Sequence, residues 1–268
     1  MKKEFMNSVI VLIPHYNNIE GLLKSVSSIG EDENVDVLIV DDGSFDKIEE
    51  DRVYKSFKAN GFLFINHLEL NLGIEHALNI GLEIILEKGY KFTARLDCGD
   101  TCVFNRFKIQ ETFLEINKEI VLVGSDVNFT DKQGRVLYSL KTPANDADIK
   151  RKMFINAMHI HPTIMFRNKI LKSIGLYPID FKAAEDFAFF FKIIQEYKVA
   201  NINSILVNCE LNPDGISFIQ RKIQAKNRIK IILKYFYIGI YPIYGLIRSV
   251  ILYILPLKVL IFMKRVFK

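Results

Sequence analysis

The chain has few cysteines and few glycines, and both shortages exclude classes of protein. Its three cysteines, Cys98, Cys102 and Cys209, form no CxxC pair, so we expect reduced thiols rather than a disulfide framework or a structural zinc site. Fourteen glycines in 268 residues are too few for a collagen repeat, and a chain that is 50% apolar is not typical of disorder. The composition therefore indicates a globular protein with its own core.

Acidic residues are missing from the last part of the sequence. From Ile219 onward there are 11 lysines and arginines and no aspartate or glutamate. The preceding 218 residues hold 25 basic and 31 acidic residues, a net charge of −6, so the overall charge of +5 describes neither part. We predict a division into an acidic body, residues 1–218, and a basic C-terminal segment, residues 219–268.

No linker rich in proline and glycine divides the body, and no long apolar run opens the chain. The apolar residues after Met1–Phe5 reach only to Pro14, which is too short for a signal peptide. The length allows one large domain or one domain with an appendage. We expect the two halves of the body to pack together as one domain.

Strands and helices alternate along the body. Runs of β-branched residues predict strands, and apolar residues at helical spacing predict helices. We predict strands at 8–13, 35–40, 62–66, 92–96, 120–126, 135–139 and 161–166, and helices at 19–29, 46–57, 75–87, 107–117, 146–156 and 185–197. This alternation favours an α/β fold with a mostly parallel sheet and helices on both faces.

Polar groups follow three of the predicted strands, at Pro14–Asn18, Asp41–Asp46 and Asp97–Asp100. Ligands of open α/β sheets bind beyond the carboxyl ends of the strands, so the three groups together predict one binding site. Each group alone is equally typical of a solvated turn or a helix cap.

Short motifs occur in a fixed order along residues 8–218. They are 11–18 (VLIPHYNN), 38–46 (LIVDDGSFD), 71–73 (NLG), 77–81 (ALNIG), 94–100 (ARLDCGD) with Arg106, 160–163 (IHPT) and 185–187 (EDF). In this order they resemble the family 2 glycosyltransferases, nucleotide-sugar enzymes of the GT-A fold. The resemblance implies a GT-A nucleotide-binding sheet in residues 1–218.

The resemblance implies that Pro14, Tyr16 and Asn17 line the nucleotide pocket. It also implies that Asp41 or Asp42 accepts hydrogen bonds from the base or the ribose, which suits a carboxylate because its oxygens only accept. Tyr16 is equally consistent with a packing aromatic.

The segment Asp97–Asp100 resembles the metal-binding acidic motif of the family. The resemblance implies that Asp97 also contacts the donor, and that Asp97 and Asp100 hold Mn²⁺ or Mg²⁺ against the diphosphate leaving group. Most members carry Asp-x-Asp-Asp, whereas this chain has Gly99 in the third position. Cys98 is interpreted as a packing residue, because a hard cation does not prefer sulfur.

Glu185 and Asp186 precede an apolar helical stretch. The resemblance makes Asp186 the general base of an inverting displacement, which deprotonates the acceptor hydroxyl as that oxygen attacks the anomeric carbon. The alternative is that both acids only complement the dipole of the helix that they open. A second carboxylate acting as nucleophile is not required for inversion.

Further polar residues are candidates for the acceptor or phosphate side of the site. The resemblance places His161 near the active site, together with Glu185, although a lone histidine is more often structural. Arg95 and Arg106 could pair with phosphate or with the neighbouring acids, and the sequence does not separate these roles.

The C-terminal segment intersperses basic and apolar residues and then becomes almost wholly apolar over 235–263. Arg248 in the middle of this block disfavours a spanning helix, at about 2.5–3.5 kcal/mol, and Pro242 and Pro256 would kink it. We therefore expect helices that lie on an anionic membrane surface, with a spanning or re-entrant segment or an oligomerisation helix pair as alternatives. The apolar block makes nucleic acid an improbable partner.

The resemblance implies an inverting hexosyl transfer from a nucleotide diphosphate sugar to a lipid-linked saccharide. It places this reaction in O-antigen (lipopolysaccharide) or capsule assembly, at the cytoplasmic face of the plasma membrane. A non-catalytic, membrane-associated scaffold and a nucleotidyltransferase are the alternatives. Release of nucleoside diphosphate would exclude the first, and the second lacks a glycine-rich phosphate loop after the first strand.

Overall fold

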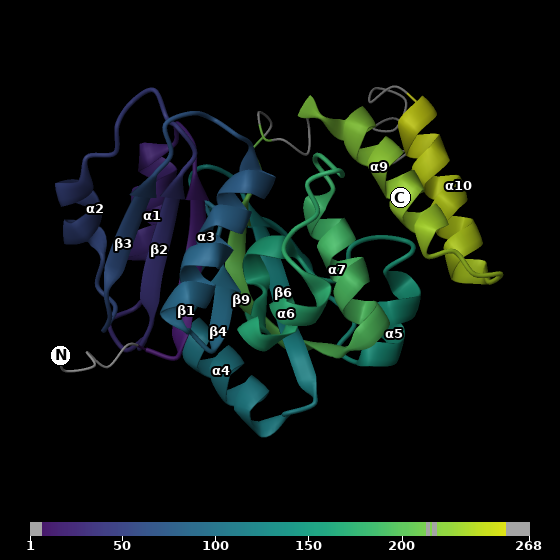
Figure 1. The fold of residues 1–268 in the computed structure, drawn as a ribbon, viewed down its shortest axis with the longest axis horizontal. Coiled ribbons are helices and arrows are strands. Elements are labelled where there is room, and N and C mark those ends of the chain that lie inside the picture. Colours follow the sequence, from purple (N-terminus) through teal and green to yellow (C-terminus); the bar gives the residue numbers. More distant parts are fainter. Residues whose placement is uncertain (1–6, 213–214, 216–218, 256–268) are drawn as a thin grey trace.

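A mixed nine-stranded sheet forms the centre of this protein, whose computed structural model describes residues 7–212, 215 and 219–255 (Figure 1). Its strands are β1 (Val9–His15), β2 (Asp36–Asp41), β3 (Leu63–His67), β4 (Phe92–Arg95), β5 (Thr101–Cys102), β6 (Ile120–Thr130), β7 (Val136–Leu140), β8 (Met165–Arg167) and β9 (Lys198–Glu210). The order is β3-β2-β1-β4-β8-β6-β9-β5, with β7 beside β6. β1 to β4 run parallel, whereas β8 is antiparallel to both of its neighbours.

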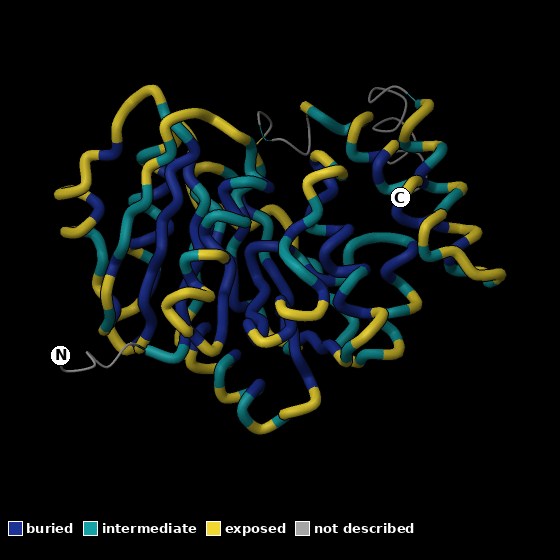
Figure 2. Tube along the Cα trace, viewed as in Figure 1, coloured by how far each residue is buried: buried dark blue, intermediate teal, exposed yellow. Residues whose placement is uncertain are grey.

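Helices cover both faces of this sheet, as the sequence predicts. They are α1 (Ile19–Ser27), α2 (Glu50–Ser56), α3 (Ile74–Lys88), α4 (Arg106–Ile116), α5 (Asp146–Lys152), α6 (Leu171–Ile174), α7 (Glu185–Glu196), α9 (Arg221–Lys234) and α10 (Ile240–Ile254). Successive residues of a strand point to opposite faces, so Leu12 of β1 packs with α3 and Ile13 packs with α1. The buried residues of the sheet and its helices are dark blue in Figure 2.

The sheet is mixed rather than mostly parallel as predicted, because β5, β7 and β8 pair antiparallel with their neighbours. The following segments differ from the prediction as well. The predicted strand at 161–166 is instead a 3₁₀ turn, η1 (His161–Thr163), followed by the short strand β8. Pro162 favours this, because proline has no N–H to give to a strand ladder. The long strand β9 was not predicted, since polar residues at 201, 203 and 204 interrupt its apolar run.

The core continues across residue 218 into the C-terminal segment. Ile231 and Ile232 of α9 are fully buried in the same cluster as the phenylalanines of α7, and α9 and α10 lie side by side beyond α7 (Figure 1). Among the described residues, no helix combines the length and apolarity needed to cross a bilayer. Pro256 and the rest of the predicted apolar block, up to residue 263, lie outside the described residues.

Helix α10 turns its small residues inward and its large apolar residues outward. Pro242, Gly245 and Ser249 are buried, and a Cβ on Gly245 would lie 2.0 Å from the carbonyl oxygen of Phe154. The outward side chains are Ile240, Ile243, Tyr244, Ile247, Ile251 and Ile254, here called the outer face of α10. Arg248 does not belong to it, because its guanidinium donates to the Ile155 carbonyl oxygen at 3.0 Å.

Candidate active site

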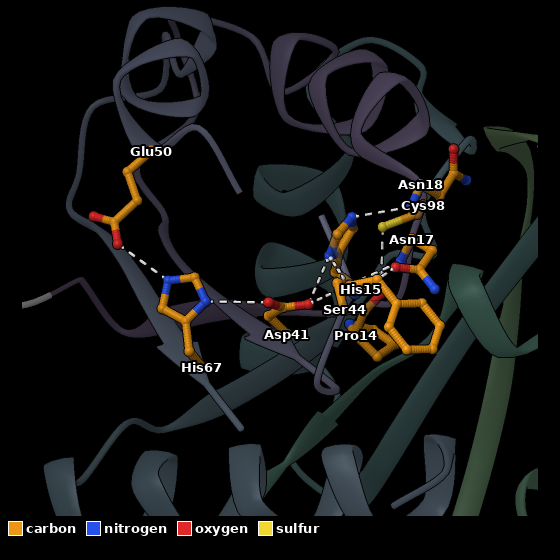
Figure 3. A network of polar contacts seen from close by, with 10 residues as sticks. Pro14, His15, Asn17, Asn18, Asp41, Ser44, Glu50, His67 and Cys98 are labelled. Carbon is orange, nitrogen blue, oxygen red and sulfur yellow. Dashed lines mark hydrogen bonds and ion pairs between the residues drawn. The ribbon is translucent and has the colours of Figure 1, made fainter. Parts of the chain in front are cut away.

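Three side chains form one row across the carboxyl ends of β1, β2 and β3. His15 and His67 are the register partners of Asp41 on its two sides. His15 Nδ1 lies 3.0 Å from Asp41 Oδ1, and His67 Nδ1 lies 3.1 Å from Asp41 Oδ2. Figure 3 shows the row continuing to Glu50, whose Oε1 is 3.0 Å from His67 Nε2.

The contacts of this row define where its protons lie. The backbone N–H of Asn18 donates to His15 Nε2 at 3.2 Å, so the hydrogen of His15 is on Nδ1 and is donated to Asp41. Although burial opposes ionisation, hydrogen bonds from Ser44, His15 and His67 hold the pKa of Asp41 below its usual value. Partial burial lowers the pKa of His67, but the bonds to its two carboxylates outweigh it and raise that pKa.

The sequence analysis did not select His15, His67 or Glu50. A usable signal existed for the two histidines, because each is the last residue of a strand that flanks β2. Parallel register then aligns both of them with Asp41. Glu50 reaches the row from the first turn of α2 and carried no such signal.

The loop after β1 is held against the loop after β2. The N–H of Asn17 donates to Ser44 Oγ at 2.8 Å, and Asn17 Oδ1 accepts from the N–H of Phe45 at 2.9 Å. Asn17 has a left-handed φ of 47°, which asparagine tolerates better than most residues. Tyr16 is 42% exposed with its ring centroid 6.3 Å from that of Phe45, so its aromatic face is available to a ligand.

Pro14 and Asp42 hold the surrounding loops in place. The Pro14 carbonyl oxygen accepts from Cys98 Sγ at 3.3 Å, which ties β1 to the acidic segment. The carboxylate of Asp42 accepts from the N–H groups of Leu72 (2.8 Å) and Gly73 (2.9 Å), and so fixes the loop that leads into α3. Burial, only partly opposed by these two bonds, raises the pKa of Asp42.

Arg95 pairs with a local acid and lies inside the protein. Its side chain is fully buried, its Nη2 is 2.5 Å from Asp97 Oδ1, and its Nη1 donates to the Leu12 carbonyl oxygen. Arg106 is also fully buried and donates to the carbonyl oxygens of Arg95 and Pro162, each at 2.7 Å. Burial leaves neither arginine accessible to a phosphate, whereas Asp97 keeps a side-chain exposure of 35%.

Asp100 turns toward the end of β9. It is 6% exposed, and its Oδ1 accepts from the N–H of Glu210 at 2.8 Å. Burial and the charge of Asp97 raise its pKa. Gly99 has a φ of +100°, and a Cβ there would lie 3.6 Å from Glu210 Oε2. The carboxylate of Glu210 thus lies beside Gly99, the position at which most family members carry an aspartate. It also forms an ion pair with Lys24 at 2.6 Å.

These contacts limit how a metal ion could be held. Among the described residues, no group of three or more His, Cys, Asp or Glu side chains is arranged to hold one. Of the two predicted ligands of a Mn²⁺ or Mg²⁺ ion, Asp97 keeps a side-chain exposure of 35%, whereas Asp100 is 6% exposed and accepts from the N–H of Glu210 on β9. Such an ion would neutralise charge that develops on a diphosphate leaving group.

Glu185 and Asp186 form the first turn of α7. Glu185 is 7% exposed, and its Oε2 has no hydrogen-bond partner in the described part of the chain. Burial, followed by the charge of Asp186, raises the pKa of Glu185. Asp186 is partly exposed and its Oδ1 accepts from the N–H of Phe187 at 2.6 Å. Burial raises the pKa of Asp186 too, against the opposing effects of that bond and of Arg228.

His161 lies in the core rather than on the surface of the site. Its Nε2 is 2.8 Å from the hydroxyl of Tyr177, and its ring packs edge-on against Tyr177 and Phe190. Burial, followed by the charge of Arg95, lowers the pKa of His161 to about 3. It is therefore neutral at physiological pH and positions Tyr177 beside the acidic residues.

The structure brings the predicted acids into one electrostatic neighbourhood. The charge of Asp97 raises the pKa values of Asp100, Glu185 and Asp186. Glu75, which the sequence analysis did not select, adds to this on both Asp42 and Glu185. Glu75 is 8% exposed and lies in the first turn of α3.

An α/β sheet with acids beyond its strand ends is typical of a ligand-binding site, and comparison with known proteins identifies the family. The chain belongs to glycosyl transferase family 2, whose profile matches residues 10–175. This confirms the family resemblance, and the motif at 185–187 lies outside the matched residues. The protein is a nucleotide-sugar-dependent glycosyltransferase of the GT-A type.

Its relatives differ in length. The chain is 29% identical over 274 residues to the amylovoran biosynthesis glycosyltransferase AmsE of Erwinia amylovora, covering 94% of this chain and 96% of AmsE. It is also 29% identical over 221 residues to an uncharacterised glycosyltransferase of Methanocaldococcus jannaschii, covering 80% of this chain and 73% of that protein. It spans only 31% of a related glycosyltransferase of Rickettsia bellii.

Solved structures share the fold at low identity. S. aureus TarS 1–349 in complex with UDP-GlcNAc superposes with a TM-score of 0.67 at 17% identity, covering 88% of this chain and 69% of that one. A mannosyltransferase from Pyrobaculum calidifontis, in complex with GDP-Man and Mn²⁺, gives 0.63 at 15% identity, covering 94% and 71%. The chain spans 41% of a longer TarS chain.

Proposed function

We propose that this protein transfers a hexosyl group, with inversion, from a nucleotide diphosphate sugar to a saccharide acceptor in surface-polysaccharide assembly. The observation that carries the proposal is that Asp186 and Asp97 both keep exposed side-chain surface, Asp97 to 35%, in a chain of glycosyl transferase family 2. One carboxylate can then serve the acceptor and the other the donor. The printed function of AmsE, amylovoran biosynthesis, supports the polysaccharide context.

In this proposal the donor lies across the ends of β1, β2 and β4. Tyr16 offers an exposed ring to the base, and Asp41 keeps a free lone pair on Oδ2, since its other three accept from Ser44, His15 and His67. Asp97 faces the diphosphate, where Mn²⁺ or Mg²⁺ shared with Asp100 would offset its charge. The Mn²⁺ in the mannosyltransferase complex supports this assignment.

Asp186 then acts as the general base. It takes the proton of the acceptor hydroxyl while that oxygen forms a bond to the anomeric carbon, and the bond from this carbon to the diphosphate oxygen breaks. The nucleoside diphosphate leaves on the opposite face, which inverts the configuration. The raised pKa of Asp186 suits this role, because a base works best when its pKa approaches the working pH.

Substitution of the base tests this proposal. Asp186→Asn keeps the shape but cannot accept the proton, so we expect release of nucleoside diphosphate to fall by about 10²–10⁴-fold. The assay uses a panel of UDP-, dTDP- and GDP-sugars with Mn²⁺, and donor affinity measured calorimetrically stays unchanged. Asp148→Asn, on the exposed first turn of α5, is the matched control. Near-normal turnover by Asp186→Asn would remove the assignment.

We further propose a lipid-linked acceptor and attachment to the cytoplasmic face of the plasma membrane. The outer face of α10 presents isoleucine and tyrosine side chains to the surroundings, and the C-terminal segment that carries it has 11 basic and no acidic residues. An exposed apolar face in a segment rich in basic residues suits a membrane that contains anionic lipid. Failure of the full chain to bind vesicles that contain anionic lipid would contradict this proposal.

A further inference from the structure

Two arginines of the C-terminal segment converge on one backbone carbonyl. Arg228 of α9 donates from Nη2 to the Ile155 oxygen at 3.3 Å, and Arg248 of α10 donates from Nη1 to the same oxygen at 3.0 Å. Because both nitrogens bond to the same oxygen, the distance between them cannot exceed the sum of these two hydrogen-bond lengths. A neutral carbonyl compensates neither charge, so the two guanidinium groups repel each other.

Neither guanidinium group has a counter-charge in contact. Within the described ranges 7–212, 215 and 219–255, no carboxylate oxygen lies within 4.0 Å of either. Arg228 also donates to Asn156 Oδ1 at 3.0 Å, yet its buried Nε has no acceptor among those residues. Burial, followed by the charge of Arg248, lowers the pKa of Arg228 to about 10.

This pair lies beside the proposed base. The guanidinium carbon of Arg228 is 4.3 Å from the ring centroid of Phe187, the neighbour of Asp186, and the charges of Arg228 and Asp186 affect each other's pKa. Both arginines are partly exposed. Arg248 also lies on α10, so the pair stands between the acids of α7 and the outer face of α10.

We propose that Arg228 and Arg248 bind the phosphate or diphosphate group of a lipid-linked acceptor, next to Asp186. Guanidinium groups present planar pairs of donors that match phosphate oxygens, and an anion between them would supply the missing counter-charge. The hydrocarbon chain of the lipid would leave along the outer face of α10. This inference rests on the proposed function, because it assigns the acceptor of the same reaction.

Binding of a soluble prenyl diphosphate tests the pair without donor or membrane. We expect the full chain to bind geranyl diphosphate in calorimetry, and Arg228→Gln/Arg248→Gln to weaken this binding at least tenfold. The control is Arg221→Gln, since Arg221 of α9 donates to the backbone carbonyl oxygens of Leu252 and Leu255 rather than to Ile155; it should stay within about twofold. Geraniol, which lacks the diphosphate, should not bind.

Two further measurements keep the test decisive. Thermal unfolding checks that the variants fold, and Arg228→Lys/Arg248→Lys, which keeps the charges but loses the planar forks, should bind with intermediate affinity. Unchanged diphosphate affinity in the folded glutamine variant would overturn the proposal. So would a loss restricted to vesicles containing phosphatidylglycerol, because it would assign the pair to bulk headgroups.

The acceptor site and the proposed reaction can fail separately. Geranyl diphosphate binding is measured without any sugar nucleotide, so it reports on the arginine pair alone. If the wild-type chain releases no nucleoside diphosphate from any donor in the panel, the proposed reaction fails. If it releases nucleoside diphosphate but the glutamine variant keeps the wild-type KM for a lipid diphosphate acceptor, only the arginine proposal fails.

Discussion

The two polar clusters of this protein differ in how far they are satisfied. At the ends of β1–β3, Asp41 accepts hydrogen bonds from His15, Ser44 and His67. Around the start of α7, Glu185 has a buried oxygen without a partner, and Arg228 has a buried nitrogen without one, in the described part of the chain. A satisfied network stabilises the fold, whereas unsatisfied charged groups are typical of sites that await a ligand.

The largest expected effect comes from breaking the satisfied cluster. Asp41→Ala leaves the Nδ1–H of His15 buried without an acceptor and removes the partner of His67, so we expect a loss of about 2–4 kcal/mol in the free energy of unfolding. Urea denaturation measures it. Asp148→Ala, which removes a partly exposed carboxylate paired with Arg151, should change stability less. Equal losses in both variants would mean that the row does not stabilise the fold.

Replacing Glu185 in the unsatisfied cluster by a neutral residue should increase the free energy of unfolding rather than lower it. The pKa of Glu185 is raised in the folded chain, so the folded state binds more protons than the unfolded one and stability falls as pH rises above about 4.5. Glu185→Gln removes this dependence. We expect its stability relative to wild type to grow by up to about 1.4 kcal/mol per pH unit from that pH toward the folded pKa.

Denaturation at several pH values measures this difference. Glu196→Gln, at the exposed opposite end of α7, is the matched control and should keep the wild-type pH profile. A constant offset between Glu185→Gln and wild type across pH 5–8 would show that Glu185 is not held protonated by its surroundings.

The smallest effect concerns the outer face of α10. Ile247 and Ile251 are 54% and 41% exposed, so Ile247→Ser/Ile251→Ser should lower binding to anionic vesicles roughly tenfold while stability stays near wild type. Cosedimentation measures it. The control is Ile109→Ser/Ile116→Ser on α4, which removes two isoleucines that are 38% and 75% exposed and lie outside the C-terminal segment. Equal binding by both double variants would refute a membrane role for this face.

The sequence predicted the local elements well where their pattern was uniform. The apolar runs of β1 and β2 and the helical spacing of α3 and α7 matched the structure because one periodicity dominates each. Strand β9 was not predicted, because its pairing with β6 stabilises a strand whose local sequence pattern is mixed. The sequence was sufficient to select each motif acid individually, but it did not predict which of these acids would interact.

What the sequence by itself determined is the fold class, the family, and the types of residue available for chemistry, because these depend on periodicity and short motifs. Only the tertiary structure decided their partners. Strand register placed His15 and His67 beside Asp41, and helix docking turned Arg248 inward to join Arg228 at Ile155. Local spacing does not encode such contacts, since they join residues far apart in the chain through packing of the whole core.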